Sequence, residues 1–204
     1  KSSAASDVYK RQYLDPPDFR LIRRSLEKPV YKEKLRLRSY GRTDRDSPVF
    51  MELKKKYRSI VYKRRLTLPY DRALDCLTGA CPWPETQIGG EIRYTVDFYP
   101  DLESRVFLAY ERDSWLAPES GLRITFDDAI RFRTEELTLD SDPWGTALLG
   151  PDQVLMELKA PGAIPLWMVR LLTEMRLYKT SFSKYGTAYQ LLLEREWKGG
   201  KRYA

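Results

Sequence analysis

Residues 30–40, VYKEKLRLRSY, alternate between basic and apolar side chains in the way expected of a β-strand. Successive side chains of a strand point to opposite faces of a sheet, so Leu35 and Leu37 share one face. The opposite face carries five polar side chains, which are Lys32, Lys34, Arg36, Arg38 and Tyr40. The segment therefore predicts a strand that is apolar on one side and strongly basic on the other.

Five further segments are predicted to be strands with polar residues on one face: 48–57, 59–66, 105–112, 122–127 and 153–159. In any single strand, a charged face exposed to solvent would explain this pattern. Its repetition favours a curled sheet, in which the polar faces line an interior and the apolar faces pack outward under helices. Small barrels enclose ligand cavities in this way.

Helical patterns lie between and after these strands, at residues 68–77, 86–99, 164–177 and 183–194. In the third of them we expect Trp167 and Met168 to be core residues. No internal repeat or long linker divides the chain. The sequence therefore predicts one domain of the α+β class, an antiparallel β-barrel with helices packed outside.

The charge of the chain is unevenly distributed. The 36 Lys and Arg outnumber the 29 Asp and Glu, which gives a net charge of +7. Residues 1–65 hold 20 of these cations and only 8 of the acids, a net charge of +12. Such asymmetry favours a polyanionic partner, either nucleic acid or a phosphate-rich small molecule, although a solvated basic surface would also explain it.

Composition excludes several kinds of chemistry. The chain has no histidine, which excludes histidine-based triads, histidine-ligated zinc and imidazole acid–base catalysis. No apolar run reaches the ~20 residues that a membrane span requires. Cys76 and Cys81 are the only cysteines, and we interpret both as packing residues of a protein in a reducing compartment, the cytoplasm.

Residues 1–12, KSSAASDVYKRQ, show no periodicity. The part DVYKRQ resembles the translation of a transposon adapter used in preparing DNA libraries. We therefore predict that residues 1–12 are non-native and lie outside the fold. The domain would then comprise residues 13–204, truncated at its N-terminus and lacking the first strand of its barrel.

Six strings in one order along the chain carry a resemblance to a known family. They are KEKLRLRSYG (32–41), VFMELKKK (49–56), VYKRRL (61–66), the pair AYERDSW and LRITFDDAIRFR (109–115 and 122–133), MELKAPGAIPLWM (156–168) and TSFSKYGTAY (180–189). Together they resemble the VTC (vacuolar transporter chaperone) domain, the polyphosphate polymerase domain of the triphosphate tunnel metalloenzyme (CYTH-like) superfamily. The resemblance runs from about residue 13 to residue 194.

The resemblance implies a tunnel of antiparallel strands whose basic lining holds a triphosphate and a growing phosphate chain. It also implies ATP and polyphosphate as substrates, transfer of the γ-phosphate of ATP with release of ADP, and a divalent cofactor, Mn²⁺ or Mg²⁺. We expect no nucleic acid partner, and the oligomeric state is left open.

The matching motifs assign roles residue by residue. By resemblance, the phosphate-binding and catalytic cations are Arg36, Arg38, Lys54, Arg112, Arg123 and Lys184. Further substrate contacts would come from Tyr110, Lys159 and Ser183, and the metal would be bound by Glu157. A salt bridge to a neighbouring arginine is the other interpretation of Glu157. Lys34 and the cluster at 63–65 match no motif residue by residue, and we expect them to line the tunnel mouth.

Elementary chemistry agrees with these roles. Phosphoryl transfer requires in-line positioning and neutralisation of charge, which arginine and lysine supply without histidine. A divalent ion that bridges phosphates needs few protein carboxylates. Two other functions stay open at this stage: a triphosphatase of the same fold, and a non-catalytic module that binds polyphosphate or nucleic acid.

Overall fold

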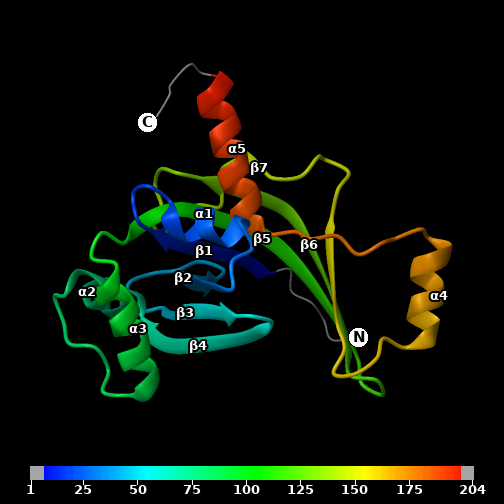
Figure 1. Ribbon diagram of the computed structural model, residues 1–204, viewed down its shortest axis with the longest axis horizontal. Coiled ribbons are helices and arrows are strands. Elements are labelled where there is room, and N and C mark those ends of the chain that lie inside the picture. Colours follow the sequence, from blue (N-terminus) through cyan, green and yellow to red (C-terminus); the bar gives the residue numbers. More distant parts are fainter. Residues whose placement is uncertain (1–6, 199–204) are drawn as a thin grey trace.

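The computed structural model describes residues 7–198 and has the α+β class that the sequence predicts (Figure 1). Its strands are β1 (Asp7–Asp15), β2 (Tyr31–Tyr40), β3 (Pro48–Tyr57), β4 (Ile60–Pro69), β5 (Glu103–Ala117), β6 (Leu122–Arg133), β7 (Thr146–Ala147) and β8 (Leu155–Lys159). Its helices are α1 (Arg20–Leu26), α2 (Tyr70–Thr78), α3 (Gln87–Phe98), α4 (Leu166–Glu174) and α5 (Lys184–Lys198). No helix within this range is long and apolar enough to cross a membrane.

The strands form one antiparallel sheet in the order β4-β3-β2-β1-β5-β6-β7, and β8 also pairs with β6. The expected closure into a barrel is not observed. Within residues 7–198, no pairing joins β4 at one edge to β7 or β8 at the other. The sheet is instead open and curled, and its edge strands β4, β7 and β8 do not pair with one another.

Strand β1 lies at the centre of the sheet, between β2 and β5. The structure thus differs from the expectation that residues 1–12 lie outside the fold, because 7–12 make up most of this strand. The Nζ atom of Lys10 is buried and donates hydrogen bonds to the carbonyls of Leu139 and Ser141, at 3.0 and 2.8 Å. The adapter origin of residues 1–12 stays a prediction.

The apolar face of the sheet packs against α2 and α3, as the strand alternation predicts. Leu35 and Leu37 of β2 and Met51 of β3 are completely buried there. They contact Ala73 and Cys76 of α2 in one hydrophobic cluster, which also includes Ile92 of α3. Burial of this face fixes which side chains must lie on the other, since successive strand residues alternate.

Helices α1 and α5 pack on the polar face, which corrects the expectation that all helices lie outside the tunnel. Figure 1 shows both over β1, on the side of the sheet away from α2 and α3. Tyr185 and Ala188 of α5 and Ile22 of α1 join Tyr13 and Val106 in a second hydrophobic cluster. One end of the polar face is therefore filled by apolar packing.

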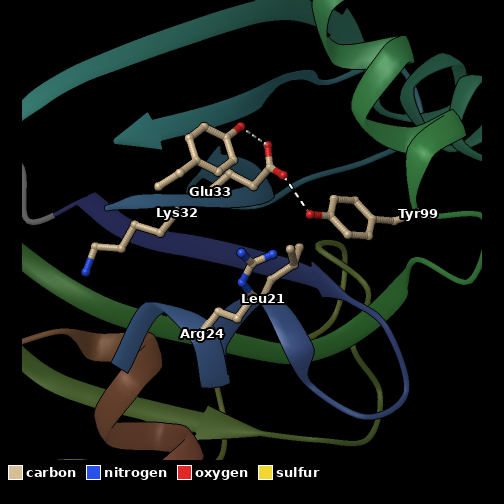
Figure 2. Close-up of a pocket in the computed structure, with 6 residues that line it drawn as sticks. Leu21, Arg24, Lys32, Glu33 and Tyr99 are labelled. Carbon is tan, nitrogen blue, oxygen red and sulfur yellow. Dashed lines mark hydrogen bonds between the residues drawn. The ribbon is translucent and has the colours of Figure 1, made fainter. Parts of the chain in front are cut away.

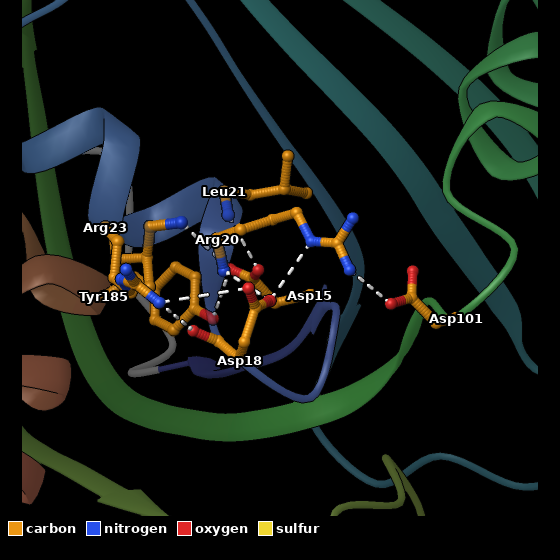
Figure 3. A network of polar contacts seen from close by, with 8 residues as sticks. Asp15, Asp18, Arg20, Leu21, Arg23, Asp101 and Tyr185 are labelled. Atoms are coloured by element: carbon orange, nitrogen blue, oxygen red, sulfur yellow. Dashed lines mark hydrogen bonds and ion pairs between the residues drawn. The ribbon is translucent and has the colours of Figure 1, made fainter. Parts of the chain in front are cut away.

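A buried carboxylate ties these helices to the sheet (Figure 3). Asp15, at the end of β1, accepts hydrogen bonds from the backbone N–H groups of Leu21 and Ile22 in α1, at 2.9 and 3.0 Å. It also accepts one from the hydroxyl of Tyr185 in α5, at 2.8 Å. A single side chain thus sets where α1 starts and where α5 meets the sheet.

Helix α4 is set apart from the other helices in Figure 1. Met168 is 3% exposed, as expected for a core residue, but Trp167 is 52% exposed. The expectation that Trp167 belongs to the core is therefore wrong. Met168 is the buried residue of this short helix, and Trp167 points away from the side that Met168 buries.

We predict that Asp15→Ala lowers the free energy of unfolding by about 3 kcal/mol, because it leaves two buried N–H groups and one buried hydroxyl without an acceptor. Urea unfolding of both proteins would measure this change. Asp18→Ala is the matched control, since the Asp18 side chain is 50% exposed and its ion pairs lie in solvent. Equal losses in the two variants would contradict the role given to Asp15.

Candidate functional site

The polar face carries a row of paired side chains across four strands. Tyr13 of β1 lies opposite Arg36 of β2, Arg36 lies opposite Glu52 of β3, and Glu52 lies opposite Arg65 of β4. Directly paired residues point to the same side of a sheet, so this register alone places a carboxylate between two arginines.

Glu52 binds three arginines. Its carboxylate lies 2.7 Å from the guanidinium of Arg36, 2.7 Å from that of Arg38 and 3.0 Å from that of Arg65. Burial raises the pKa of Glu52, but the three arginines outweigh burial and hold the pKa below its usual range. Glu52 thus orients the predicted site residues Arg36 and Arg38 and fixes their guanidinium groups on this face.

Asp127 organises a second group of cations around β5 and β6. Its side chain is 1% exposed and accepts hydrogen bonds from Arg112, one of them at 2.6 Å, and from Lys184 of α5. Burial raises the pKa of Asp127, but Arg112 and Lys184 outweigh it and keep the carboxylate ionised. Two predicted site residues therefore meet on one buried carboxylate that the sequence did not single out.

The start of α5 spans the face between these two groups. The Nζ atom of Lys34 in β2 donates to the hydroxyl of Ser183 at 3.2 Å, while the neighbouring Lys184 binds Asp127 of β6. Strands β1 and β5 lie between β2 and β6, so residues 183 and 184 bridge them. Burial and the neighbouring Lys63 lower the pKa of Lys54, and Glu157 of β8 partly offsets this effect. The sheet therefore curls enough to bring the charge of Glu157 near Lys54.

Tyr110 lies among the cations. The guanidinium carbons of Arg11 and Arg112 are 4.8 and 5.3 Å from its ring centroid, and the Nζ atom of Lys184 is 4.7 Å away. Its hydroxyl is buried and has no hydrogen-bond partner among the described residues. Burial raises the pKa of Tyr110 to about 12, so the phenol keeps its proton and can donate to an anion.

The remaining predicted residues lie further out. Arg123 is exposed at the start of β6, where its Nε atom donates to the hydroxyl of Ser114 at 3.2 Å. Lys159 lies opposite Arg123 in β8 and forms an ion pair with Glu157 at 3.1 Å. The structure thus places both at the rim of the polar face and not beside Asp127.

Two residues of β1 belong to the site although the sequence did not indicate them. Arg11 and Tyr13 lie on the polar face opposite Arg38 and Arg36. Arg11 falls in the segment expected to lie outside the fold, and Tyr13 is the first residue of the predicted domain. The sequence DVYKRQYLD has little apolar alternation, so only its pairing with β2 and β5 identifies residues 7–15 as a strand.

A small cavity lies away from these cations, whereas a larger one borders Arg112. Glu33 lines a space of about 10 Å³, no larger than one water molecule, and accepts hydrogen bonds there from Tyr31 and Tyr99, both at 2.8 Å (Figure 2). A larger one of about 350 Å³ is lined by Arg112 together with the acidic Glu111, Asp113 and Asp128 and the apolar Trp115, Phe126 and Val154. Three carboxylates against one arginine do not suit a phosphate ligand.

The open, curled antiparallel sheet with its basic, partly buried face is similar to a triphosphate tunnel fold that is not closed. A crystal structure of a protein from Bacillus halodurans, provisionally named an adenylate cyclase, shares this fold with a TM-score of 0.51 and 14% sequence identity, over 87% of this chain and 79% of that one. The family model described as VTC domain matches residues 2–193, and the chain belongs to this family. No curated protein sequence matches the chain significantly.

Enzymes of the triphosphate tunnel superfamily generally use divalent metal ions, and Glu157 is the residue that resemblance assigns to such an ion. Glu157 is 47% exposed at the side chain, and burial raises its pKa while Lys159 and Arg112 outweigh burial and lower it. The described residues contain no group of three or more metal-ligating side chains. An accessible, ionised carboxylate fits an ion whose other ligands are phosphate oxygens and water.

We predict that Tyr13 ionises near neutral pH. Burial raises its pKa, but Arg36, Arg11 and Lys34 outweigh burial and lower the pKa to about 7, helped by a hydrogen bond from Arg36 at 3.0 Å. Absorbance of tyrosinate at ultraviolet wavelengths should show one transition near pH 7 that Tyr13→Phe lacks. A wild-type titration identical to that of Tyr13→Phe would contradict this assignment.

The same shift predicts a pH dependence of stability. Tyrosine in the unfolded chain ionises near pH 10, so the ionised form favours the fold. Relative to Tyr13→Phe, the wild-type protein should gain stability as the pH rises from about 7 to about 10. This advantage should be lost as the pH falls through 7, which urea unfolding at several pH values would measure.

Proposed function

We propose that this chain is an ATP-dependent polyphosphate polymerase that transfers the γ-phosphate of ATP to a growing polyphosphate chain. The observation that carries the proposal is the excess of cations on the polar face. Lys and Arg on this face or at its rim outnumber the carboxylates there, which include Glu52, Asp127 and Glu157; the cations include Arg11, Lys32, Lys34, Arg36, Arg38, Lys54, Lys56, Lys63, Arg65, Arg112, Arg123, Lys159 and Lys184.

Much of this charge has no internal partner. Arg11, Lys54 and Lys63 form no ion pair with a carboxylate within the described part of the chain, and the buried hydroxyl of Tyr110 has no acceptor there. Lys54 and Lys63 are exposed to solvent, but the buried Nε of Arg11, the buried hydroxyl of Tyr110 and the clustering of like charges are costly unless a ligand satisfies them. A polyphosphate supplies several anionic oxygens at spacings that such a row of cations can bind.

The proposed reaction needs little covalent work from the protein. A terminal oxygen of the polyphosphate chain attacks the γ-phosphorus of ATP, the bond to the β-phosphate oxygen breaks, and ADP leaves. Arg36, Arg38 and Arg112 are held by carboxylates in fixed orientations, which suits them to bind phosphoryl oxygens in line. A divalent ion held by Glu157 would neutralise charge on the transferred phosphate.

ATP and polyphosphate are accordingly the proposed substrates, with Mn²⁺ or Mg²⁺ as cofactor. The proposed location is the cytoplasm, which supplies ATP. Tyr110 and Ser183 would contact the phosphates through their hydroxyls, and Lys54 and Lys184 as point charges. Lys159 and Arg123, at the rim, would contact the chain where it leaves the face.

We predict that the protein, incubated with ATP and Mn²⁺, produces ADP and long-chain polyphosphate. Gel electrophoresis of the polymer and chromatography of the nucleotide would measure both products. Free orthophosphate without polymer would identify a triphosphatase instead. Polyphosphate binding without turnover under either metal would identify a non-catalytic binding module and contradict the proposal.

Arg112→Ala should lower the rate of polymer synthesis by about 100-fold, because it removes one preorganised donor to a transferring phosphate. The matched control is Arg93→Ala on α3, on the opposite side of the sheet; its side chain is 63% exposed and forms an ion pair with Asp97 at 3.3 Å. Equal rates for Arg112→Ala and Arg93→Ala would contradict the role of Arg112.

Glu157→Gln tests the metal assignment. The amide keeps the size of the side chain but binds a divalent ion weakly, so metal-dependent turnover should be lost while affinity for polyphosphate is kept or increased. Filter binding of labelled polyphosphate would measure the affinity. Full metal-dependent activity in this variant would remove Glu157 from the metal site.

A further inference from the structure

The two cysteines of the chain lie in contact, far from the proposed phosphate site. The Sγ atoms of Cys76 and Cys81 are 3.2 Å apart. Cys76 belongs to α2 and is 1% exposed, whereas Cys81 follows the helix and is partly exposed. A disulfide bond measures about 2.05 Å, so a movement of about 1 Å would join the two sulfurs.

The turn that ends α2 brings these sulfurs together. Gly79 has a φ of 78°, in the left-handed region where glycine is unstrained. The N–H groups of Ala80 and Cys81 then both donate to the carbonyl of Asp75, at 2.8 and 3.3 Å. The chain therefore folds back over the last turn of the helix, and Cys81 is held against Cys76 by backbone hydrogen bonds.

We propose that Cys76 and Cys81 are a redox-active pair that closes to an intramolecular disulfide by exchange with a low-molecular-weight disulfide. This inference extends beyond the interpretation of both cysteines as packing residues. It does not depend on the proposed polymerase activity, because neither cysteine lies on the polar face.

Disulfide exchange takes two steps, and the greater solvent exposure of Cys81 makes it the thiol that reacts first. The thiolate of Cys81 attacks one sulfur of the small disulfide and releases the first small thiolate. The thiolate of Cys76 then attacks the Sγ atom of Cys81 in the mixed disulfide and releases the second. Two protein thiols are oxidised, one small disulfide is reduced to two thiols, and the two protons pass to the departing thiolates.

The second step should be the slower one near neutral pH. Burial and the adjacent Cys81 raise the pKa of Cys76 to about 11, so little of it is thiolate at pH 7. Attack requires the thiolate. At pH values below this pKa, the thiolate fraction increases about tenfold for each unit by which the pH rises. Ring closure should therefore accelerate as the pH rises from 7 to 9.

The disulfide would tie the end of α2 to the segment that leads to α3. Both helices cover the apolar face behind β3, where Cys76 packs in the same cluster as Met51 and Leu53. A loop of this size restricts the unfolded chain modestly, and the oxidised protein should melt about 5 °C higher than the reduced protein.

The test is incubation of the full chain with glutathione disulfide at pH 7 and pH 9, followed by intact mass and trypsin mapping. Cleavage after Arg72 and Arg93 leaves both cysteines in one peptide, residues 73–93. We expect this peptide to lose the mass of two hydrogens, faster at pH 9. Persistence of both free thiols, or disulfide-linked dimers, would overturn the proposal.

Two serine variants separate the roles of the cysteines. Cys76→Ser should gain one glutathionyl group on Cys81 and stop there, since the resolving thiol is missing. Cys81→Ser should keep a free thiol at Cys76 as long as the protein is folded. Rapid glutathionylation of Cys76 in folded Cys81→Ser would overturn the assignment of Cys81 as the first nucleophile.

Discussion

The buried carboxylate of Asp15 positions both helices that pack on the polar face of the sheet. It ends the central strand, accepts two backbone N–H groups at the start of α1 and receives the hydroxyl of Tyr185 in α5. Burial raises the pKa of Asp15 to about 6, although these hydrogen bonds oppose the effect. Because Tyr185 follows Lys184 directly, the same anchor determines where that lysine reaches the sheet.

A second constraint is electrostatic. Like charges gathered on one partly buried face repel each other. Two carboxylates, Glu52 and Asp127, reduce this repulsion, because each forms ion pairs with more than one cation. Both carboxylates orient arginines without neutralising the face. The remaining positive charge is what a phosphate chain would satisfy, so the same arrangement serves stability and the proposed binding.

Much of the fold follows from the sequence alone. The strands predicted at 30–40, 48–57 and 59–66 correspond to β2, β3 and β4, and in β2 and β3 the alternation of apolar and charged residues specifies which face is buried. Strand β1 is not predicted because DVYKRQYLD carries polar residues on both faces. One of these residues, Lys10, is buried and donates hydrogen bonds to two carbonyls that are remote in the chain. Trp167 was misplaced since helical periodicity does not say whether a neighbour covers the apolar side.

The sequence by itself determined the family, the strand alternation and the cations that β2 and β3 place on the polar face, because these depend on residue type and local spacing. Only the tertiary structure decided that the sheet stays open, that α5 enters the polar face, and that Glu52 and Asp127 hold the arginines. These features arise from pairs far apart in the chain, such as Lys34 with Ser183 and Lys184 with Asp127. Register and helix docking create such pairs, and no local pattern records them.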